Sequence, residues 1–323
     1  MIISYTISTA NYLPYAISLG DSILQHNPDY KFIIVLVDKV DYFDKNKIKY
    51  PILPVEKMDI DSFGLMNERY NIFELSCALK PFAAAYFFEK ESNCEKIFYF
   101  DCDMLVFNSL KLAEDKLNDN AILITPHLVS TKLFDYREKV ETGILKTGIY
   151  NAGFWGVSRN DNAISFLNWW KSKTKSFCYD DLKQGLFVDQ LWLNMAIVFF
   201  DNIHVLNNEG YNVAYWNLGE RKISISNNTF FAEDKKLVLF HFSGYDVLNP
   251  IYLSKHFPYL NFETNPEVIP LFESYKQGAL KNNSESFFGL NPFFGKPKVV
   301  VENLPPPRET FLKRKLRKLL NKM

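Results

Sequence analysis

Two apolar runs in the first third of the chain each end abruptly at an aspartate. Residues 32–37 read FIIVLV and stop at Asp38, and residues 96–100 read KIFYF and stop at Asp101. A strand that is apolar on both faces is typical of a parallel sheet with helices on each side. Ligands of such open sheets collect beyond the carboxyl ends of the strands, so a binding crevice is expected there.

Runs of strand and helix character alternate along the chain. In the first hundred residues they follow one another at 2–8, 15–26, 32–37, 72–89 and 96–100, and later runs lie at 151–158, 163–171, 189–198 and 237–242. This alternation predicts βαβ units and an α/β fold whose mostly parallel sheet is flanked by helices. Pro81 predicts a helix start or a kink within 72–89, because proline has no amide hydrogen to donate.

The amount of apolar sequence is sufficient for a large folded domain. Of the 323 residues, 47% are hydrophobic, and we expect one large domain to span residues 1–286. Near residue 287 the character changes, with prolines at 292, 297, 305, 306 and 307. These predict an extended segment over residues 287–307, which either covers a cleft or links the domain to a tail.

The charges and cysteines exclude several classes of protein. Lysine plus arginine and aspartate plus glutamate both total 37, so no net field would recruit nucleic acid, and no nucleic-acid partner is expected. The four cysteines are widely spaced without a Cys-x-x-Cys pair, which argues against a disulfide scaffold or a structural zinc site. The amino terminus lacks signal-peptide character, and no apolar run approaches the ~20 residues of a membrane span. A cytoplasmic location is therefore expected.

Residues 308–323 predict a short basic amphipathic helix. Apolar residues fall on one helical face at Leu312, Leu316, Leu319, Leu320 and Met323, and lysines and arginines surround them. Such a segment suits an anionic membrane surface, where each basic residue contributes about 1 kcal/mol. A peripheral position on the inner face of the cell membrane follows, although a disordered solubilising tail and a nucleic-acid arm remain alternatives.

The triplet Asp101-Cys102-Asp103 is the best candidate metal site. An Asp-x-Asp triplet alone is weak evidence, since Asp59-Ile60-Asp61 has the same form in a polar context. Because Asp101 and Asp103 follow a buried strand, both carboxylates are expected to point into one crevice and bind a hard divalent cation. The alternative is a pair of solvated turn acids.

His241 is a second candidate ligand. It lies in the apolar run LVLFHFSG, where a lone histidine is either a satisfied core residue or a ligand. Together with two carboxylates, an imidazole makes a mixed nitrogen and oxygen site that suits Mn²⁺ at least as well as Mg²⁺. Gly244, three residues later, would allow the backbone to approach a phosphate.

Five short motifs in order resemble a known family. They are STANY at 8–12, FYFDCD at 98–103, YNAGF at 150–154, DQLWLN at 189–194 and HFSG at 241–244. Together they resemble nucleotide-sugar glycosyltransferases of the GT-A fold, most nearly glycosyltransferase family 8. The resemblance implies a Rossmann-like GT-A domain followed by a C-terminal extension.

The resemblance also implies roles for single residues. Ala10 and Tyr12 would line the pocket of the nucleotide base, with Asp38 accepting a hydrogen bond from uracil. Asp101, Asp103 and His241 would bind Mn²⁺ (or Mg²⁺). The alternative for Ala10 and Tyr12 is an ordinary loop.

On the sugar side of the site, the resemblance implies that Asn151 and Gly153 contact the donor together with Asp189 and Gln190. Asp189 or Gln190 would stabilise the positive charge of the sugar ring, or act as a transient nucleophile. Asp189 could equally be the N-cap of the following helix. Lys80 would contact the phosphate or ribose of the donor, although a surface position is the ordinary expectation for a lysine.

The chain departs from the family after Gly244. Members usually continue with a Lys-Pro-Trp element that holds the diphosphate, whereas residues 245–250 read YDVLNP. Lys255 or a residue of the tail is a possible substitute. The departure leaves the stereochemical outcome of the reaction open.

The function expected is metal-dependent transfer of a hexose-type sugar from a UDP-sugar to a glycan or lipid-linked acceptor of the cell envelope, with retention. An inverting enzyme, with Asp189 or Asp246 as base, is one alternative. A nucleotidyltransferase is disfavoured because residues 8–14 lack glycine. The third alternative is an inactive, membrane-docked carbohydrate-binding or scaffold protein.

Overall fold

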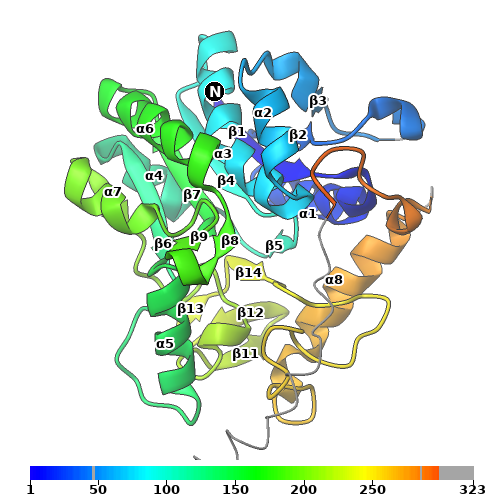
Figure 1. Cartoon of the computed structure of the whole chain (residues 1–323). Helices are drawn as coiled ribbons and strands as arrows, with labels where there is room; N and C mark the ends of the chain where they lie inside the picture. Colours follow the sequence, from blue (N-terminus) through cyan, green and yellow to red (C-terminus); the bar gives the residue numbers. More distant parts are fainter. Residues whose placement is uncertain (46–47, 284–285, 298–323) are drawn as a thin grey trace, which may run out of the picture.

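The centre of the protein is a seven-stranded sheet. The computed structural model describes residues 1–45, 48–283 and 286–297 (Figure 1). The strand order is β10-β6-β7-β4-β1-β2-β3. The strands span Ile2–Ser8 (β1), Lys31–Leu36 (β2), Ile52–Pro54 (β3), Lys96–Phe100 (β4), Ile122–Pro126 (β6), Tyr150–Ser158 (β7) and Ile203–Val205 (β10). Only β7 runs antiparallel to its neighbours within this sheet, so the prediction of a mostly parallel α/β sheet is confirmed.

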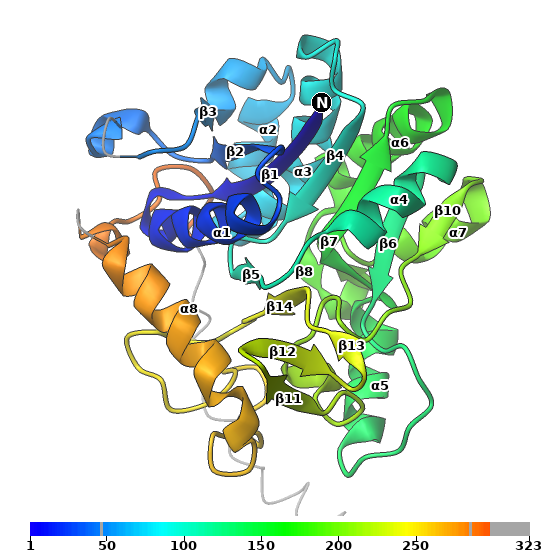
Figure 2. The same ribbon diagram turned by 180° about the vertical axis from the view of Figure 1, so that it is seen from behind.

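Helices cover both faces of the sheet, which explains the uninterrupted apolar strands. On one face lie α2 (Phe63–Arg69), α3 (Ile72–Lys90) and α6 (Asp161–Phe177), and on the other lie α1 (Leu13–His26) and α4 (Lys111–Asp119) (Figures 1 and 2). Alternate residues of β2 belong to different cores: Ile33 and Val35 pack with α3, whereas Ile34 and Leu36 pack with α1. Both faces of the strand are therefore buried, as expected of a parallel sheet.

The position of the start of α3 corrects a prediction. The helix begins at Ile72 and continues as one α-helix through Pro81, so Pro81 does not start it. Asn71 caps the helix by accepting hydrogen bonds from the backbone N–H groups of Phe73 and Glu74, and Glu74 completes a capping box. This cap fixes the start of the helix nine residues upstream of the proline.

A second layer lies beyond the carboxyl ends of the central strands. It contains the antiparallel pair β5 (Met104–Val106) and β14 (Leu239–His241), and a small sheet of β11 (Ile223–Ser226), β12 (Thr229–Ala232) and β13 (Lys235–Lys236). The helices α5 (Arg137–Thr147) and α8 (Ile269–Lys281) flank it (Figure 1). The hairpin β8 (Asp180–Asp181) and β9 (Leu186–Phe187) and the helix α7 (Leu193–Phe199) complete the described secondary structure, together with short 3-10 turns.

The described part of the expected extended segment packs on the domain. Phe287 and Phe294 are buried, and the backbone N–H of Gly295 donates to Asn67 Oδ1 at 2.7 Å. The N–H of Lys296 donates to the carbonyl of Tyr70, also at 2.7 Å. Residues 286–297 are therefore continuous with the core. The division of the chain at residue 287 stays a prediction, and the basic segment 308–323 lies outside the described residues.

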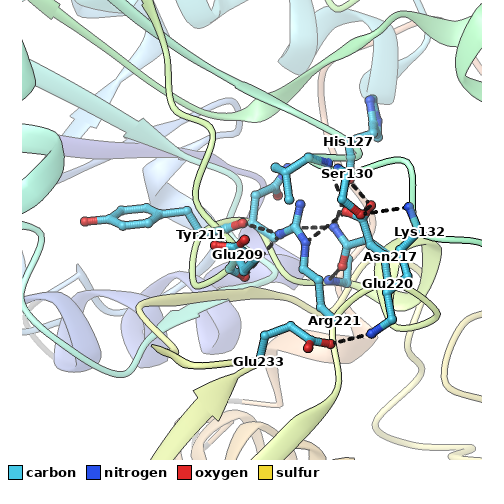
Figure 3. Close-up of polar contacts among 12 residues, drawn as sticks. His127, Ser130, Lys132, Glu209, Tyr211, Asn217, Glu220, Arg221 and Glu233 are labelled. Atoms are coloured by element: carbon cyan, nitrogen blue, oxygen red, sulfur yellow. Dashed lines mark hydrogen bonds and ion pairs between the residues drawn. The ribbon is translucent and has the colours of Figure 1, made fainter.

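A buried ion pair joins the loop before α5 to the chain after β10 (Figure 3). The side chains of Glu220 and Arg221 are both 0% exposed and approach to 3.2 Å. Glu220 accepts hydrogen bonds from the backbone N–H groups of Val129 and Ser130, while Arg221 donates to the carbonyl of Tyr211. Two loops that are distant in sequence are thus tied to one charge pair.

Removal of one partner of this pair is expected to destabilise the protein strongly. Glu220→Ala leaves the Arg221 guanidinium buried without its countercharge, so the free energy of unfolding should fall by about 3–5 kcal/mol in urea denaturation. The matched control is Asp234→Ala, which removes the exposed ion pair with Lys235 and should change the free energy of unfolding far less, because water screens that pair. Equal losses in both variants would contradict the role assigned to Glu220.

Candidate functional site

Two aspartates and a histidine converge where β4 ends. Asp101 and Asp103 lie in the turn between β4 and β5, and the pairing of β5 with β14 places Met104 opposite His241. His241 Nε2 lies 3.0 Å from Asp103 Oδ1 and 3.9 Å from Asp101 Oδ2. The three candidate ligand atoms all lie within 4.8 Å of one another. The structure therefore brings together the three residues that the sequence predicted as metal ligands.

The cluster is electrostatically matched to a cation. Burial by itself lowers the pKa of His241, but the carboxylate of Asp103, and after it that of Asp101, outweighs burial and raises the pKa of the imidazole. Burial likewise opposes ionisation of Asp103, yet His241 holds the pKa of that carboxyl below its ordinary value. Two oxygen ligands and one nitrogen ligand fit a Mn²⁺-type ion. Such an ion competes with the imidazole proton, so its affinity is expected to decrease in acid.

Gly153 is required by the approach of the histidine. A Cβ at this position would lie 2.7 Å from Asn151 Oδ1 and 2.8 Å from His241 Cε1. The carbonyl of Gly153 also accepts a hydrogen bond from the backbone N–H of Asp101 at 2.8 Å. The glycine thus holds β7 against the turn that carries the carboxylates.

Lys80 is a buried partner of two carboxylates and not a surface residue. Its Nζ lies 3.1 Å from Asp101 Oδ1 and 3.2 Å from Asp189 Oδ2, and donates to the carbonyl of Ala152 at 3.2 Å. The ammonium also lies 4.8 Å from the centre of the Tyr99 ring. Burial lowers the pKa of Lys80, but the charges of Asp101 and Asp189 outweigh burial, so the pKa is raised and the group stays charged.

Asp189 is buried at the base of the site. Its side chain is 1% exposed, and its backbone carbonyl accepts a hydrogen bond from Trp170 Nε1. It does not cap α7, because that helix begins at Leu193 with Trp192 at the N-cap. Burial, together with the charge of Asp101, raises the pKa of Asp189 to about 6, although Lys80 opposes this shift.

Gln190 and Asn151 orient each other. Gln190 Oε1 accepts hydrogen bonds from Asn151 Nδ2 at 3.1 Å and from the backbone N–H of Ala152 at 3.2 Å. Its Nε2 donates to the carbonyl of Thr147. Both ends of the Gln190 amide are therefore engaged in holding the start of β7. A catalytic role for Gln190 stays a prediction.

His127 is a residue of this site that the sequence analysis missed. It is buried directly after β6, with Nδ1 3.0 Å from the carbonyl of Ile149 and Nε2 3.3 Å from Asn151 Nδ2. Burial lowers its pKa to about 4, so the ring is neutral near pH 7. The ring of Trp216 contacts both His127 and His241, at centroid distances of 5.2 and 5.3 Å. His127 directly follows the apolar strand β6, and this position in the sequence could have identified it as a candidate site residue.

Two further predicted site residues, Ala10 and Tyr12, lie in the turn after β1. Tyr12 is 42% exposed and contacts Tyr15, whose ring lies 5.3 Å from that of Phe288. Burial raises the pKa of Tyr12 to about 12, and the charges of Cys102 and Asp103 act in the same direction. Ala10 is fully buried below it.

Asp38 faces the protein backbone. It is 0% exposed, and its Oδ2 accepts a hydrogen bond from the N–H of Ala10 at 3.1 Å. Its Oδ1 accepts from the N–H groups of Lys39 and Phe293, both at 3.0 Å. The carboxylate therefore joins three segments of the chain. The contact between Asp38 and uracil stays a prediction.

Gly244 adopts a left-handed conformation with φ +74°. A Cβ there would lie 2.5 Å from His256 Cδ2 and 2.6 Å from Ser254 Oγ, so its neighbours also exclude a side chain. The position three residues further on, Val247, is 1% exposed and apolar.

The chain was compared with protein families, with known sequences and with solved structures. No family model matches the chain. The chain is similar to the uncharacterized proteins YfnF and YfnD of Bacillus subtilis (strain 168). The identity with YfnF is 23% over 248 residues, which cover 76% of this chain and 82% of YfnF. The identity with YfnD is 21% over 232 residues, which cover 70% of this chain and 72% of YfnD.

Several glycosyltransferases are among the solved structures that this chain resembles. They include the galactosyltransferase LgtC in complex with donor and acceptor sugar analogues (18% identity, 75% of this chain and 86% of that chain, TM-score 0.44). Mouse xyloside xylosyltransferase 1 is similar at 12% identity over 75% and 97% of the chains, with the same TM-score. The likeness is one of fold, so the chemistry is argued below from the residues of this chain. No helix in the described ranges is long and apolar enough to cross a membrane.

The pairing of Lys80 with Asp189 gives a testable coupling. Lys80→Met leaves two carboxylates without their shared cation and should lower the free energy of unfolding by about 3–5 kcal/mol. Adding Asp189→Asn removes one of those carboxylates, so the double variant should recover part of the loss. A double-mutant cycle in urea, with chelator present, measures this coupling. Strictly additive losses would contradict the ion pair.

The raised pKa of Asp189 predicts a pH dependence of stability. Between the ordinary value of 3.8 and about 6, the folded protein binds this proton more tightly than the unfolded chain. The free energy of unfolding should therefore fall as pH rises through this window, by on the order of 2 kcal/mol. Asp189→Asn should lack this fall when both proteins are compared by urea denaturation from pH 4 to 7. Parallel pH profiles would refute the assignment.

Proposed function

We propose that this protein is a metal-dependent glycosyltransferase. It transfers a hexose-type sugar from a UDP-sugar to a glycan or lipid-linked acceptor, with retention of configuration. The observation that carries the proposal is the Asp101, Asp103 and His241 cluster at the end of a buried parallel strand, with ligand atoms within 4.8 Å of one another. A second acidic group, Asp189, lies behind it across the ammonium of Lys80.

The chemistry of sugar transfer explains why these groups belong together. Cleavage of the bond between the anomeric carbon and a diphosphate leaves negative charge on the phosphate oxygens and positive character on the sugar ring. A Mn²⁺ or Mg²⁺ ion held by Asp101, Asp103 and His241 would stabilise the departing diphosphate. Residues on the other side of the site must then stabilise the sugar.

Asp189 is the best candidate for that second task. The amide of Gln190 is committed to Asn151, Ala152 and the carbonyl of Thr147, whereas the charged partner of the Asp189 carboxylate is Lys80. A carboxylate with a pKa of about 6 is ionised at neutral pH and stabilises a developing cation. Asn151 and Gly153 would contact the sugar from β7, and Ala10, Tyr12 and Asp38 would form the base side of the site.

An inverting glycosyltransferase, the nearest alternative, would depend on a different carboxylate. An inverting enzyme requires a base on the acceptor side, and Asp246 Oδ1 instead accepts hydrogen bonds from the backbone N–H groups of Leu248 and Asn249.

We also propose that residues 308–323 dock on the anionic inner face of the cell membrane, near a cell-envelope acceptor. This segment lies outside the described residues, so the proposal depends on its amphipathic sequence.

The decisive experiment is a screen of nucleotide sugars for Mn²⁺-dependent release of nucleoside diphosphate. Asp101→Asn and Asp103→Asn should each reduce turnover by about 100-fold or more, because each removes a ligand of the ion that stabilises the leaving group. Chelation should abolish turnover, and Mn²⁺ should restore it.

The matched control comes from the second Asp-x-Asp triplet. Asp61 is exposed, and Asp61→Asn should leave turnover unchanged. Release of pyrophosphate would indicate nucleotidyl transfer instead. Donor binding without turnover under any acceptor would indicate a carbohydrate-binding or scaffold protein.

A further inference from the structure

Exposed apolar residues gather where α6 and α7 lie at one edge of the molecule (Figures 1 and 2). Phe177 ends α6 and Phe199 ends α7, and each is 50% exposed. Met195 and Val198 of α7 are 43% and 78% exposed. Spacings of three and four residues put Met195, Val198 and Phe199 on one side of their helix. These four residues form a surface that we call the α7 patch, and contiguous exposed apolar surface is typical of interaction sites.

Two tryptophans connect the residues of the α7 patch. The ring centroid of Trp169 lies 5.8 Å from that of Phe199, and the ring centroid of Trp192 lies 6.3 Å from that of Phe177. The indole N–H of Trp192 also donates to the carbonyl of Phe177 at 3.2 Å. Both indoles are half-buried, whereas the other tryptophans of the chain are at most 7% exposed; these are Trp155, Trp170 and Trp216.

The segments that form the α7 patch carry only positive charge. Residues 162–179 contain three lysines and no aspartate or glutamate, and residues 190–200 contain no charged residue. Lys173 Nζ lies 5.7 Å from the centre of the Trp192 ring. Two residues later, Lys175 is exposed, and the guanidinium of Arg69 donates to its carbonyl at 2.9 Å. Cationic groups therefore border the aromatic end of the patch.

This combination of side chains fits an anionic lipid surface better than a second copy of the chain. Tryptophan is enriched where lipid headgroups meet acyl chains, because its ring is apolar and its N–H is polar. Lysines beside such rings are attracted to anionic headgroups. Two copies of the chain joined through the same patch would bring their lysines together, and like charges repel. The charge therefore favours lipid as the partner.

The α7 patch and the proposed sugar-facing acid are held by the same helix. Trp170, which follows Trp169 in α6, is buried and donates its indole N–H to the carbonyl of Asp189 at 3.0 Å. Beside Phe177, an open cavity of about 520 Å³ extends the patch along the hairpin that precedes Asp189; its other lining residues are Tyr179, Asp181, Gln184 and Leu186. A membrane bound at the patch would thus contact the helix that supports Asp189.

We infer that the α7 patch is a docking surface for an anionic membrane. Its four apolar side chains enter the headgroup region of the bilayer, and Lys173 and Lys175 contact the headgroups. This surface belongs to the folded domain and is distinct from residues 308–323. The inference goes beyond the proposed function, because it holds whichever sugar is transferred.

The two half-buried tryptophans make this docking directly measurable. The full chain is mixed with vesicles of phosphatidylcholine and phosphatidylglycerol whose acyl chains carry bromine, which quenches the fluorescence of indoles that reach the bilayer. Residues 308–323 contain no tryptophan, so binding through that segment alone gives no such signal. Tryptophan fluorescence should fall relative to vesicles without bromine. The double variant Trp169→Phe/Trp192→Phe should still bind but lose most of the quenching.

Single substitutions test the apolar and the charged contacts separately in a vesicle sedimentation assay. Val198→Glu places a carboxylate at a 78% exposed position and should weaken vesicle binding by about tenfold or more. Lys175→Gln should weaken binding to the anionic vesicles by about fivefold and change binding to phosphatidylcholine alone little. The matched control is Ile225→Glu, which adds the same charge at a 53% exposed apolar residue of β11 and should bind as the wild type does. If Val198→Glu lowers the midpoint of thermal unfolding, Met195→Glu takes its place.

Several outcomes would overturn the inference and leave sugar transfer as a separate question. Vesicle binding without tryptophan quenching would assign docking to another segment, and residues 308–323 would then be the candidate. A dimer of the wild type that is lost in Val198→Glu, measured by sedimentation velocity without lipid, would make the α7 patch a subunit interface. Equal losses in Val198→Glu and Ile225→Glu would reduce the effect to net charge. A wild type that does not bind the vesicles would exclude the patch and residues 308–323 alike.

Discussion

One buried ammonium makes the rest of the site possible. Taking two carboxylates out of water is costly, and Lys80 offsets that cost for Asp101 and Asp189 at 3.1 and 3.2 Å. It also donates to the carbonyl of Ala152, so helix α3, the end of β4, the start of β7 and the loop before α7 meet at a single nitrogen. The charge that stabilises the fold therefore also sets the distance between the candidate metal ligand and the candidate sugar-facing acid.

A second constraint is the short pairing of β5 with β14. Only three residue pairs define it, yet it sets Met104 opposite His241 and brings an imidazole from the late chain to the aspartates of the early chain. Gly153 is necessary for the same reason, since a side chain there would collide with His241. The candidate cation site thus depends on strand register and on one close backbone approach. Phe154, next to Gly153, and Phe240, next to His241, are each buried in a hydrophobic core.

Local pattern was sufficient to predict the parallel sheet and the strand ends, because each follows from a few neighbouring residues, whereas the convergence of Asp101, Asp103 and His241 was implied by the family resemblance. Asp101 and Asp103 come directly after an apolar run, and His241 interrupts another. The burial of Lys80 could not be read this way, because its partners lie at positions 101, 152 and 189. The start of α3 was available locally, because Asn71 and Glu74 form a capping box upstream of Pro81. Asp189 does not cap α7, because that helix begins at Leu193.

Asp38 shows how the same strand-end position can serve the scaffold. Both Asp38 and Asp101 follow apolar parallel strands, but Asp101 is partly exposed in the site, whereas Asp38 is fully buried and accepts three backbone N–H groups. One of those donors is Phe293, which lies 255 residues away in the sequence. Phe288 also contacts Tyr15, so residues from both ends of the described chain meet beside the turn after β1. Asp38 therefore joins the turn after β1 to the segment that contains Phe293, whereas Tyr12 in the same turn remains 42% exposed.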